Sequence, residues 1–422
     1  MDEKNIALEA IRKKLIGKKL SYKEIFAVMD EIANNKLGDI LTTYFVASGY
    51  SKGFSDEEIY YLTRAMVETG EKLHFKGIVA DKHSIGGVPG TRLTMIIVPI
   101  VASAGFKIPK SSSRAITTPA GTADAMEVLA DVTFDEKEIY KIIDETKGCI
   151  VWGGSFKIAP ADDEIIRIEE PLLFESFDKI LVSVMAKKIA FGSNHVVIDL
   201  PYGKTAKIHN LHDVNIIAEK FKQLARRFNI KLEVSINDVR QPAGNGIGPL
   251  LEARDALKVL EQTDDRPIDL EKRAIGLSSQ LLDLCIQDSV TIKKDVFKKY
   301  KNTKEWVKDI LISGRALFKM KEIIKIQKGN PRITSLDLHP GEFSYKYKAK
   351  RTGEISFIDN KNLTIIAKVL GAPQSKKAGI YLYKRLGDIV EKGEPLFSLY
   401  SESRYKLNEA LESLELFPLH RL

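Results

Sequence analysis

The chain has 422 residues, of which 44% are hydrophobic and 29% charged, with 65 Lys and Arg against 57 Asp and Glu. This length predicts two or three domains, and the composition excludes a mainly disordered or fibrous chain. The longest apolar stretch, around residues 95–105, is shorter than the roughly 20 residues of a membrane span. With two cysteines the chain can form at most one disulfide, which cannot stabilise a protein of this size. The first residues lack the apolar segment of a secretory signal. We therefore expect a reduced, cytoplasmic protein that is not associated with a membrane.

The formal charge of +8 points either to nucleic acid or to small anions as partners. Basic residues are dispersed and interleaved with acids, as at residues 271–273, and no basic block with interleaved aromatic residues is present. We therefore expect no nucleic-acid partner. An enzyme that handles phosphate is favoured over a Lys-rich surface that serves only solubility.

Helices are predicted over the first 70 residues, where apolar residues recur at helical spacing from Ile6 to Leu15. Ser21 with Glu24, and Ser55 with Glu58, have the spacing of capping boxes and mark two helix starts. From about residue 78 short apolar strands alternate with helices, which predicts an α/β domain with a largely parallel sheet. The predicted strands are 78–81, 195–199 and 231–236, and the predicted helices are 91–104, 177–189 and 214–228.

A second break lies near residues 331–341. Beyond it, β-type runs at 353–358 and 379–384 alternate with turns and precede a helix near 402–415. We predict a smaller α+β domain from about residue 335. The expected fold class is therefore α/β, with a helical domain, a large α/β domain and a C-terminal α+β domain.

A glycine-rich turn, DKHSIGGVPGTR (81–92), follows the first apolar strand and precedes a helix. Gly86 and Gly87 allow backbone amides to approach an anion closely, and Lys82 and Ser84 add a cation and a hydroxyl. The turn is neither a dinucleotide fingerprint nor a Walker loop, because its lysine precedes the glycines. An ordinary strand-to-helix connection is the alternative to a phosphate site. His83 lies within this motif and is a candidate general acid.

A second turn, within SSSRAITTPAGTADAMEVL (111–129), holds six hydroxyl residues and one arginine before a helix that begins near Thr122. Such hydroxyls and amides bind phosphate or ribose, although the plain alternative is a loop that caps the next helix. The two turns favour function together, because turns after strands meet at the carboxyl edge of an open α/β sheet.

Other candidates are weaker. Ser183 and Lys187 lie four residues apart on one face of a predicted helix, where a solvated lysine is the usual case. GNGIGP (244–249) matches a dinucleotide motif poorly, and we interpret it as a structural loop. No metal-ligand spacing, nucleophile elbow or paired Cys-x-x-Cys occurs, so we expect no metal, no cofactor and no covalent nucleophile.

Together these motifs resemble a known family. DKHSIGG resembles the signature turn of thymidine and pyrimidine-nucleoside phosphorylases, and the longer pattern resembles the archaeal-type AMP phosphorylases within that family. The resemblance to AMP phosphorylases in particular rests on the motifs SRAIT and PAGTAD, which stand where thymidine phosphorylases have a loop that contains glycine and histidine. The segments that carry the resemblance are DKHSIGGVPG, SSSRAITTPAGTADAMEVL, CIVWGG (149–154), APADD (159–163), LVSVMAKK (181–188), HVVIDLPYGKTAKI (195–208) and QPAGNGIGPLLEARD (241–255).

The resemblance implies three domains with an active cleft between the first two. Residues 1–70 with 163–210 would form the helical domain, 71–162 with 211–334 the phosphate-binding α/β domain, and 335–422 the C-terminal domain. The implied reaction is phosphorolysis, in which AMP and phosphate give adenine and ribose 1,5-bisphosphate, with CMP and UMP as further substrates. The implied substrate-binding residues are Lys82, Ser84, Gly86, Gly87, Thr94, Ser112, Ser113, Arg114, Ala115, Ile116, Thr117, Thr118, Thr122, Ser183, Lys187 and Lys207.

The chain departs from the family at three places. The family places an aspartate proton donor eight residues before the serine that Ser183 matches, and here that residue is Glu175. The pyrimidine-contacting arginine of thymidine phosphorylases has no counterpart near residues 168–169, and Arg167 is merely adjacent. AMP phosphorylases also carry a small N-terminal domain linked to large assemblies, whereas this chain begins almost directly with helices. We therefore expect a natural or truncated short form that makes a homodimer.

Three other functions stay open on the sequence. A phosphorylase of thymidine or another nucleoside would need no pocket for a 5′-phosphate. A phosphoribosyltransferase of the anthranilate type would need magnesium and an acidic motif, for which Asp162 and Asp163 are the obvious acidic pair. A regulator that binds AMP without releasing base is supported by the departure at Glu175 and by the absent N-terminal domain.

Overall fold

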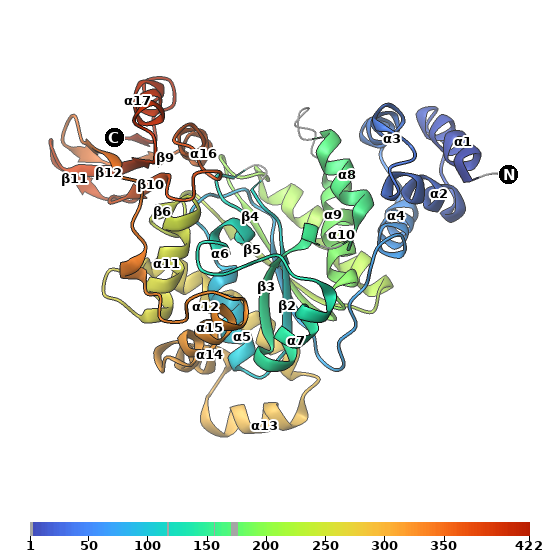
Figure 1. Cartoon of the computed structure of the whole chain (residues 1–422), viewed down its shortest axis with the longest axis horizontal. Coiled ribbons are helices and arrows are strands. Elements are labelled where there is room, and N and C mark those ends of the chain that lie inside the picture. Colours follow the sequence, from blue (N-terminus) through green and yellow to red (C-terminus); the bar gives the residue numbers. More distant parts are fainter. Residues whose placement is uncertain (1–2, 116–117, 156, 170–175) are drawn as a thin grey trace. The chain divides into compact units, whose positions relative to one another are not determined.

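The computed structural model describes residues 3–115, 118–155, 157–169 and 176–422 (Figure 1). The chain forms two compact units. The first unit comprises Met1–Asp81, Gly153–Val196 and Asn215–Leu232. The second unit comprises Lys82–Trp152, Val197–Val214 and Glu233–Leu422.

The first unit is a bundle of helices. The predicted capping boxes are confirmed, because Ser21 and Ser55 each accept a hydrogen bond from the backbone of Glu24 and Glu58, whose carboxylates bond back to the serine amides. Two helices from later in the chain, α8 and α9, pack against this N-terminal group. The helices are α1 (Glu3–Leu15), α2 (Tyr22–Ala33), α3 (Asp39–Lys52), α4 (Asp56–Glu68), α8 (Pro160–Glu169), α9 (Phe177–Ala190) and α10 (Leu211–Arg227).

The α/β part of the chain contains a three-stranded sheet in the order β1-β4-β5 and a parallel pair, β2 and β3, in which Ile108 lies opposite Gly148. Helix α5 is buried along nearly its whole length between these strands and helices α11, α12, α14 and α15. The strands are β1 (Ala80–Ser84), β2 (Ile108–Ser112), β3 (Gly148–Trp152), β4 (His195–Tyr202) and β5 (Lys231–Asp238). The helices are α5 (Thr94–Ser103), α6 (Thr122–Met126), α7 (Glu136–Thr146), α11 (Pro249–Glu261), α12 (Ile268–Ile286), α13 (Val290–Lys299), α14 (Thr303–Ile312) and α15 (Arg315–Ile326), with 3₁₀ turns η1 (Gly153–Ser155) and η3 (Ser335–Asp337).

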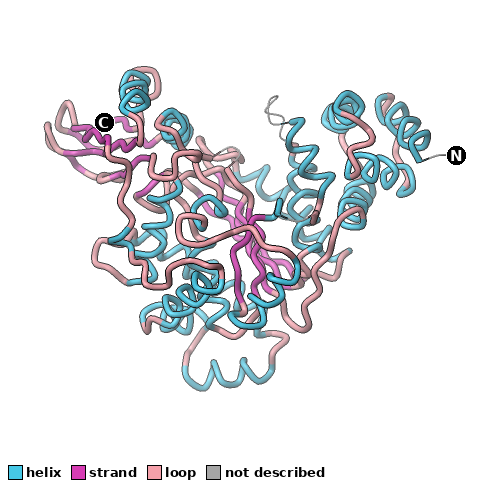
Figure 2. Tube along the Cα trace, viewed as in Figure 1, coloured by secondary structure: helices cyan, strands magenta, loops and turns pink. Residues whose placement is uncertain are grey.

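The C-terminal part is built on antiparallel strands, drawn in magenta beside the C-terminus in Figure 2. Its main sheet has the order β6-β10-β12-β7, and two short pairs, β11–β8 and β13–β9, accompany it. The expected fold class is confirmed: a helical bundle, an α/β part with parallel strands and a C-terminal α+β part. The elements are β6 (Gly246–Ile247), β7 (Phe343–Lys348), β8 (Gly353–Glu354), β9 (Phe357–Ile358), α16 (Asn360–Val369), β10 (Gly379–Leu382), β11 (Ile389–Val390), β12 (Pro395–Ser401), α17 (Arg404–Ser413) and β13 (His420–Arg421).

Three local interpretations need correction. The first strand extends to Ser84, so Asp81 to Ser84 belong to β1 and not to the turn. GNGIGP is not only a loop, because Gly246 and Ile247 form β6 and pair with Tyr381 and Ile380 of β10. The run at 353–358 is two strands, β8 and β9, with different partners. The two-residue strands are too short for an alternation pattern to reveal them.

No helix among the described residues combines the length and the apolar character that crossing a membrane requires.

The C-terminal core contains a histidine that we expect to make stability sensitive to acid. His420 stacks on Phe397, with ring centroids 5.5 Å apart, and burial lowers the pKa of His420 to about 4. Between pH 6.5 and about 4, His420 is therefore protonated in the unfolded chain but stays neutral in the folded chain. Stability should fall by about 1–3 kcal/mol between pH 6.5 and 4.

The matched variant is His420→Phe, which keeps an aromatic ring on Phe397 and cannot titrate. Thermal unfolding of both proteins at pH 7.5 and 4.5 checks the prediction. The difference in melting temperature between the two pH values should be smaller in His420→Phe. Equal differences would contradict the role assigned to His420.

Candidate active site

The end of β1 sets a cation and a hydroxyl side by side in the second unit. Lys82 is buried, and its ammonium donates to the hydroxyl of Ser84. Ser84 in turn donates to Asp199 of β4 at 2.8 Å. The Asp199 side chain is 1% exposed and is neutralised by Arg273, 3.3 Å away, while Asn237 of β5 donates to it at 2.9 Å. These contacts hold the ammonium of Lys82 and the hydroxyl of Ser84 side by side at the end of a strand.

The glycine-rich turn that follows β1 packs closely against the segment after β4. A Cβ on Gly86 would lie 2.1 Å from Pro201, and one on Gly87 would lie 3.1 Å from the Lys207 side chain. Gly87 has a φ of +58°, which other residues rarely adopt. The amide of Lys207 donates to the carbonyl of Gly86 at 3.2 Å. The fold therefore brings Lys207 onto the turn.

The second turn begins at the end of β2. Ser112 is buried there, and its hydroxyl has no hydrogen-bond partner within the described residues. A buried hydroxyl without a partner costs free energy, so its retention favours a ligand or a water molecule as the missing partner. The carboxylate of Asp124 accepts from the amides of Ala115 at 2.7 Å and Gly121 at 2.8 Å, at opposite ends of the turn. Ile116 and Thr117 lie outside the described residues.

Arg92 joins the two turns. It lies at the end of the first turn, and its guanidinium donates to Thr122 at 3.1 Å and to the carbonyl of Ala120 at 2.9 Å in the second. Its third contact is an ion pair of 2.6 Å with Glu252 of α11, whose side chain is fully buried. Because Glu252 also accepts from the amide of Gly90, the same carboxylate holds the first turn. The expectation that the two turns lie together is supported by this bridge.

The first unit holds a separate cluster on α8 and α9. Ser183 donates to Asp162 at 2.7 Å, and the ammonium of Lys187 contacts the same carboxylate oxygen at 2.7 Å. The Asp162 side chain is fully buried, and its second oxygen has no hydrogen-bond partner within the described residues. The helical spacing of Ser183 and Lys187 therefore does place them together, with Asp162 between them.

The charges in this cluster are set by opposing effects. Burial opposes the charge of Lys187, but the carboxylates of Asp162 and Asp163 outweigh it and raise the pKa of Lys187. Burial also raises the pKa of Asp163, although Lys187 partly offsets this effect. Lys187 therefore stays protonated at neutral pH and is about a quarter exposed, so it can meet an anionic ligand.

The remaining predicted residues are placed as follows. Glu175 lies outside the described residues. His83 is half-buried and is the penultimate residue of β1, and Thr94 is the buried first residue of α5. Arg167 forms ion pairs with Asp39 at 2.5 Å and Glu164 at 2.9 Å.

Family models match three parts of the chain. Residues 8–70 match the helical bundle domain of a glycosyl transferase family, and residues 76–261 match the α/β domain of that family. Residues 354–416 match the C-terminal domain of pyrimidine nucleoside phosphorylases.

Curated relatives align over almost the full chain. AMP phosphorylase 1 of Archaeoglobus fulgidus is 41% identical over 96% of this chain and 78% of its own length. AMP phosphorylase of Thermofilum pendens is 42% identical over 97% and 77%. A putative thymidine phosphorylase of Legionella pneumophila is 38% identical over 97% and 76%. The chain belongs to the thymidine/pyrimidine nucleoside phosphorylase family.

This phosphorylase is accordingly a glycosyltransferase whose substrates are a nucleoside or nucleotide and inorganic phosphate. An anthranilate phosphoribosyltransferase from Thermus thermophilus has the same fold, with a TM-score of 0.58 over 76% of this chain and 99% of its own. At 16% identity this likeness shows only the fold.

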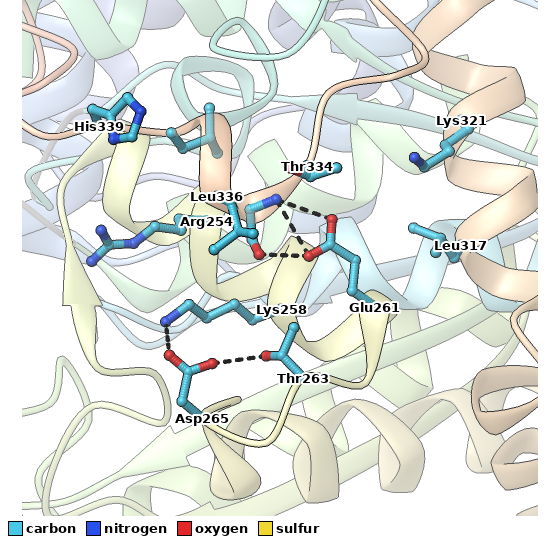
Figure 3. A pocket seen from close by; sticks show the side chains of 12 residues that line it. Arg254, Lys258, Glu261, Thr263, Asp265, Leu317, Lys321, Thr334, Leu336 and His339 are labelled. Carbon is cyan, nitrogen blue, oxygen red and sulfur yellow. Dashed lines mark hydrogen bonds and ion pairs between the residues drawn. The ribbon is translucent and has the colours of Figure 1, made fainter.

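A pocket away from the predicted residues is present in the second unit of the phosphorylase (Figure 3). It has a volume of about 640 Å³, and Arg254, Lys258 and His339 are among its lining residues. None of the residues that the sequence predicted to bind substrate lines it. Within the described residues, no cluster of three or more His, Cys, Asp or Glu side chains is arranged to hold a metal ion.

Sequence reasoning missed several positioning residues of the phosphorylase. Asp199 lies inside a segment that carried the resemblance and Arg92 lies at the end of the first turn, yet nothing in their local pattern indicates a partner. Glu252 is separated from Arg92 by 160 positions. For Asp162 the sequence indicates only an acidic pair with Asp163, of the kind that diphosphate recognition would need. The signal available for Asp162 was its place in the acidic first turn of α8, within the APADD segment that carried the resemblance.

Proposed function

We propose that the enzyme is an AMP phosphorylase that converts AMP and phosphate into adenine and ribose 1,5-bisphosphate, with CMP and UMP as further substrates. The observation that carries the proposal is the pair of turns joined by Arg92, each rich in groups that bind anions. A nucleotide phosphorylase must hold two anions, the attacking phosphate and the 5′-phosphate. The AMP phosphorylases at 41–42% identity support the same assignment.

The contacts of Arg167 argue against thymidine as the substrate. Arg167 is the arginine nearest to the position where thymidine phosphorylases contact the pyrimidine. Its ion pairs with Asp39 and Glu164 already occupy that guanidinium. The second candidate is nevertheless a thymidine or other pyrimidine-nucleoside phosphorylase, because putative thymidine phosphorylases are 38% identical to the chain.

Catalysis in this proposal needs positioning and electrostatics. An oxygen of phosphate attacks C1′ of the ribose while the bond from C1′ to the base nitrogen breaks, and the electron pair leaves with the base. Positive charge builds on the sugar and is met by the negative phosphate. Lys82, Ser84, Gly86, Gly87, Thr94, Ser112 and Thr122 are proposed to hold the phosphate groups.

The nucleotide would be bound by two further groups of residues. The second turn would contact it through Ser113, Arg114, Ala115, Ile116, Thr117 and Thr118, and Ser183, Lys187 and Lys207 would bind the base or the 5′-phosphate. Glu175 is proposed to donate the proton to the departing base, with His83 as a second candidate acid. Proton donation of this kind contributes about 10²–10⁴-fold to the rate. A cytoplasmic homodimer remains part of the proposal.

The test is base release from AMP, adenosine and thymidine, each with and without phosphate and without magnesium. We expect phosphate-dependent release of adenine from AMP, much faster than from adenosine. In the same assay Glu175→Gln should lose most of its kcat while its KM for AMP changes little. Faster release from thymidine or adenosine would overturn the proposal in favour of a nucleoside phosphorylase. Binding of AMP without release of base would favour a regulator.

A further inference from the structure

The C-terminal part of the chain is joined to the α/β part by backbone contacts. Strand β6 lies within the segment that approaches the first turn, and it pairs with β10 of the C-terminal sheet. The amide of Gly244 donates to the carbonyl of Gly90 at 2.7 Å, and Arg385 donates to the carbonyl of Gly244 at 2.7 Å. Figure 1 shows β6 beside β10 and above α11. The C-terminal sheet is therefore attached directly to the segment that supports the first turn.

One side chain carries the attachment to the second turn. Lys376 precedes β10, and its backbone is fixed because its carbonyl accepts from the amide of Leu250 at 3.1 Å. Its ammonium contacts Asp124 at 3.1 Å and Glu127 at 2.8 Å. The two carboxylates lie in and directly after the short helix α6, about 250 positions away in the chain.

Asp124 is the residue that shapes the described ends of the second turn. Its carboxylate is 3% exposed and accepts from the amides of Ala115 and Gly121. A buried carboxylate is costly without cations beside it. Lys376 at 3.1 Å and Arg114 at 3.4 Å are the cations within ion-pair distance of Asp124 in the described part of the chain.

Glu127 reinforces the same arrangement. Its two oxygens accept from both terminal nitrogens of Arg114, at 2.6 and 2.7 Å, and Lys376 lies 2.8 Å from one of them. Arg114, followed by Lys376, lowers the pKa of Glu127 to about 2. Glu127 is therefore charged throughout the neutral range, and Lys376 shares it with the arginine of the turn.

We propose that Lys376 is a positioning residue that holds the described ends of the second turn, at Ala115 and Gly121, in place for nucleotide binding through Asp124 and Glu127. The inference rests on the proposed role of that turn in binding the nucleotide. It gives the C-terminal part of the chain a task in substrate binding without a direct contact to substrate. Loss of the ammonium leaves Asp124 with one cation, so the amides of Ala115 and Gly121 are held less firmly.

The test compares Lys376→Met, Lys376→Arg and the control Lys377→Met, which removes a neighbouring lysine whose side chain is exposed. The KM for AMP should rise about tenfold in Lys376→Met, stay near wild type in Lys377→Met and recover in large part in Lys376→Arg. KM is independent of the amount of folded enzyme, so a loss of folded protein alone would leave it unchanged. An unchanged KM in Lys376→Met overturns the proposal.

Hydrogen exchange provides a readout that needs no activity. The amides of Ala115 and Gly121 should exchange faster in Lys376→Met than in wild type, while peptides covering β5 should keep their rates. Equal protection at both amides would overturn the proposal even if Lys376→Met folds poorly. If wild type releases base from thymidine and not from AMP, the proposed function fails. The KM comparison then uses thymidine, and the role of Lys376 is judged separately.

Discussion

Replacing Lys188 with Met is expected to lower the free energy of unfolding of the first unit by about 3–5 kcal/mol. Lys188 forms an ion pair of 2.5 Å with Asp81, and the two side chains are 1% and 0% exposed. Ser193 also donates to the Asp81 carboxylate, at 3.2 Å. The neutral side chain would remove the ammonium of Lys188 from that buried carboxylate, so less of the desolvation cost of its charge would be offset.

Both tryptophans, Trp152 and Trp306, lie in the second unit, so their fluorescence follows urea unfolding of that unit. Helices are present in both units, so the part of the circular dichroism change that does not coincide with the fluorescence change reports the first unit. Arg12→Met is the matched control, because the ion pair of Arg12 with Glu9 is well exposed and should contribute under about 1 kcal/mol. The double variant Asp81→Asn with Lys188→Met should recover part of the loss. A Lys188→Met midpoint equal to that of Arg12→Met would contradict the prediction.

Replacing Arg92 with Lys is expected to lower kcat/KM about 100-fold, the typical cost of displacing a binding group by about 1 Å. The guanidinium of Arg92 makes three directed contacts, to Glu252, Thr122 and the carbonyl of Ala120. A lysine keeps the charge beside the buried carboxylate but lacks the planar fork. The bridge between the two turns should therefore loosen while the charge of Glu252 stays compensated.

Steady-state kinetics with AMP and phosphate, together with the melting temperature, check this prediction. Arg240→Lys is the control, because Arg240 is 73% exposed and pairs only with Asp238 in the described part of the chain. It should keep wild-type kinetics. A value of kcat/KM within twofold of wild type in Arg92→Lys would show that the two turns hold their positions without the bridge.

Local patterns in the sequence determined much of the fold of this protein. Ser21 and Ser55 begin helices because a capping box is complete within four residues, and no distant contact is needed. The alternation of short apolar runs with helices predicted the α/β part, since strands buried on both faces read as continuous apolar segments. The spacing of Ser183 and Lys187 placed them on one face of a helix, where they lie in the structure.

Tertiary structure alone decided which side chains meet around the candidate site. Asp162 lies between Ser183 and Lys187, Asp199 orders the end of β1, and Lys376 reaches Asp124 from about 250 positions away. Periodicity and capping report only on neighbours within a few residues, whereas these ion pairs depend on how strands are ordered and which helices pack together. Strand β6 could not be predicted for the same reason, because its two residues form a strand only by pairing with β10.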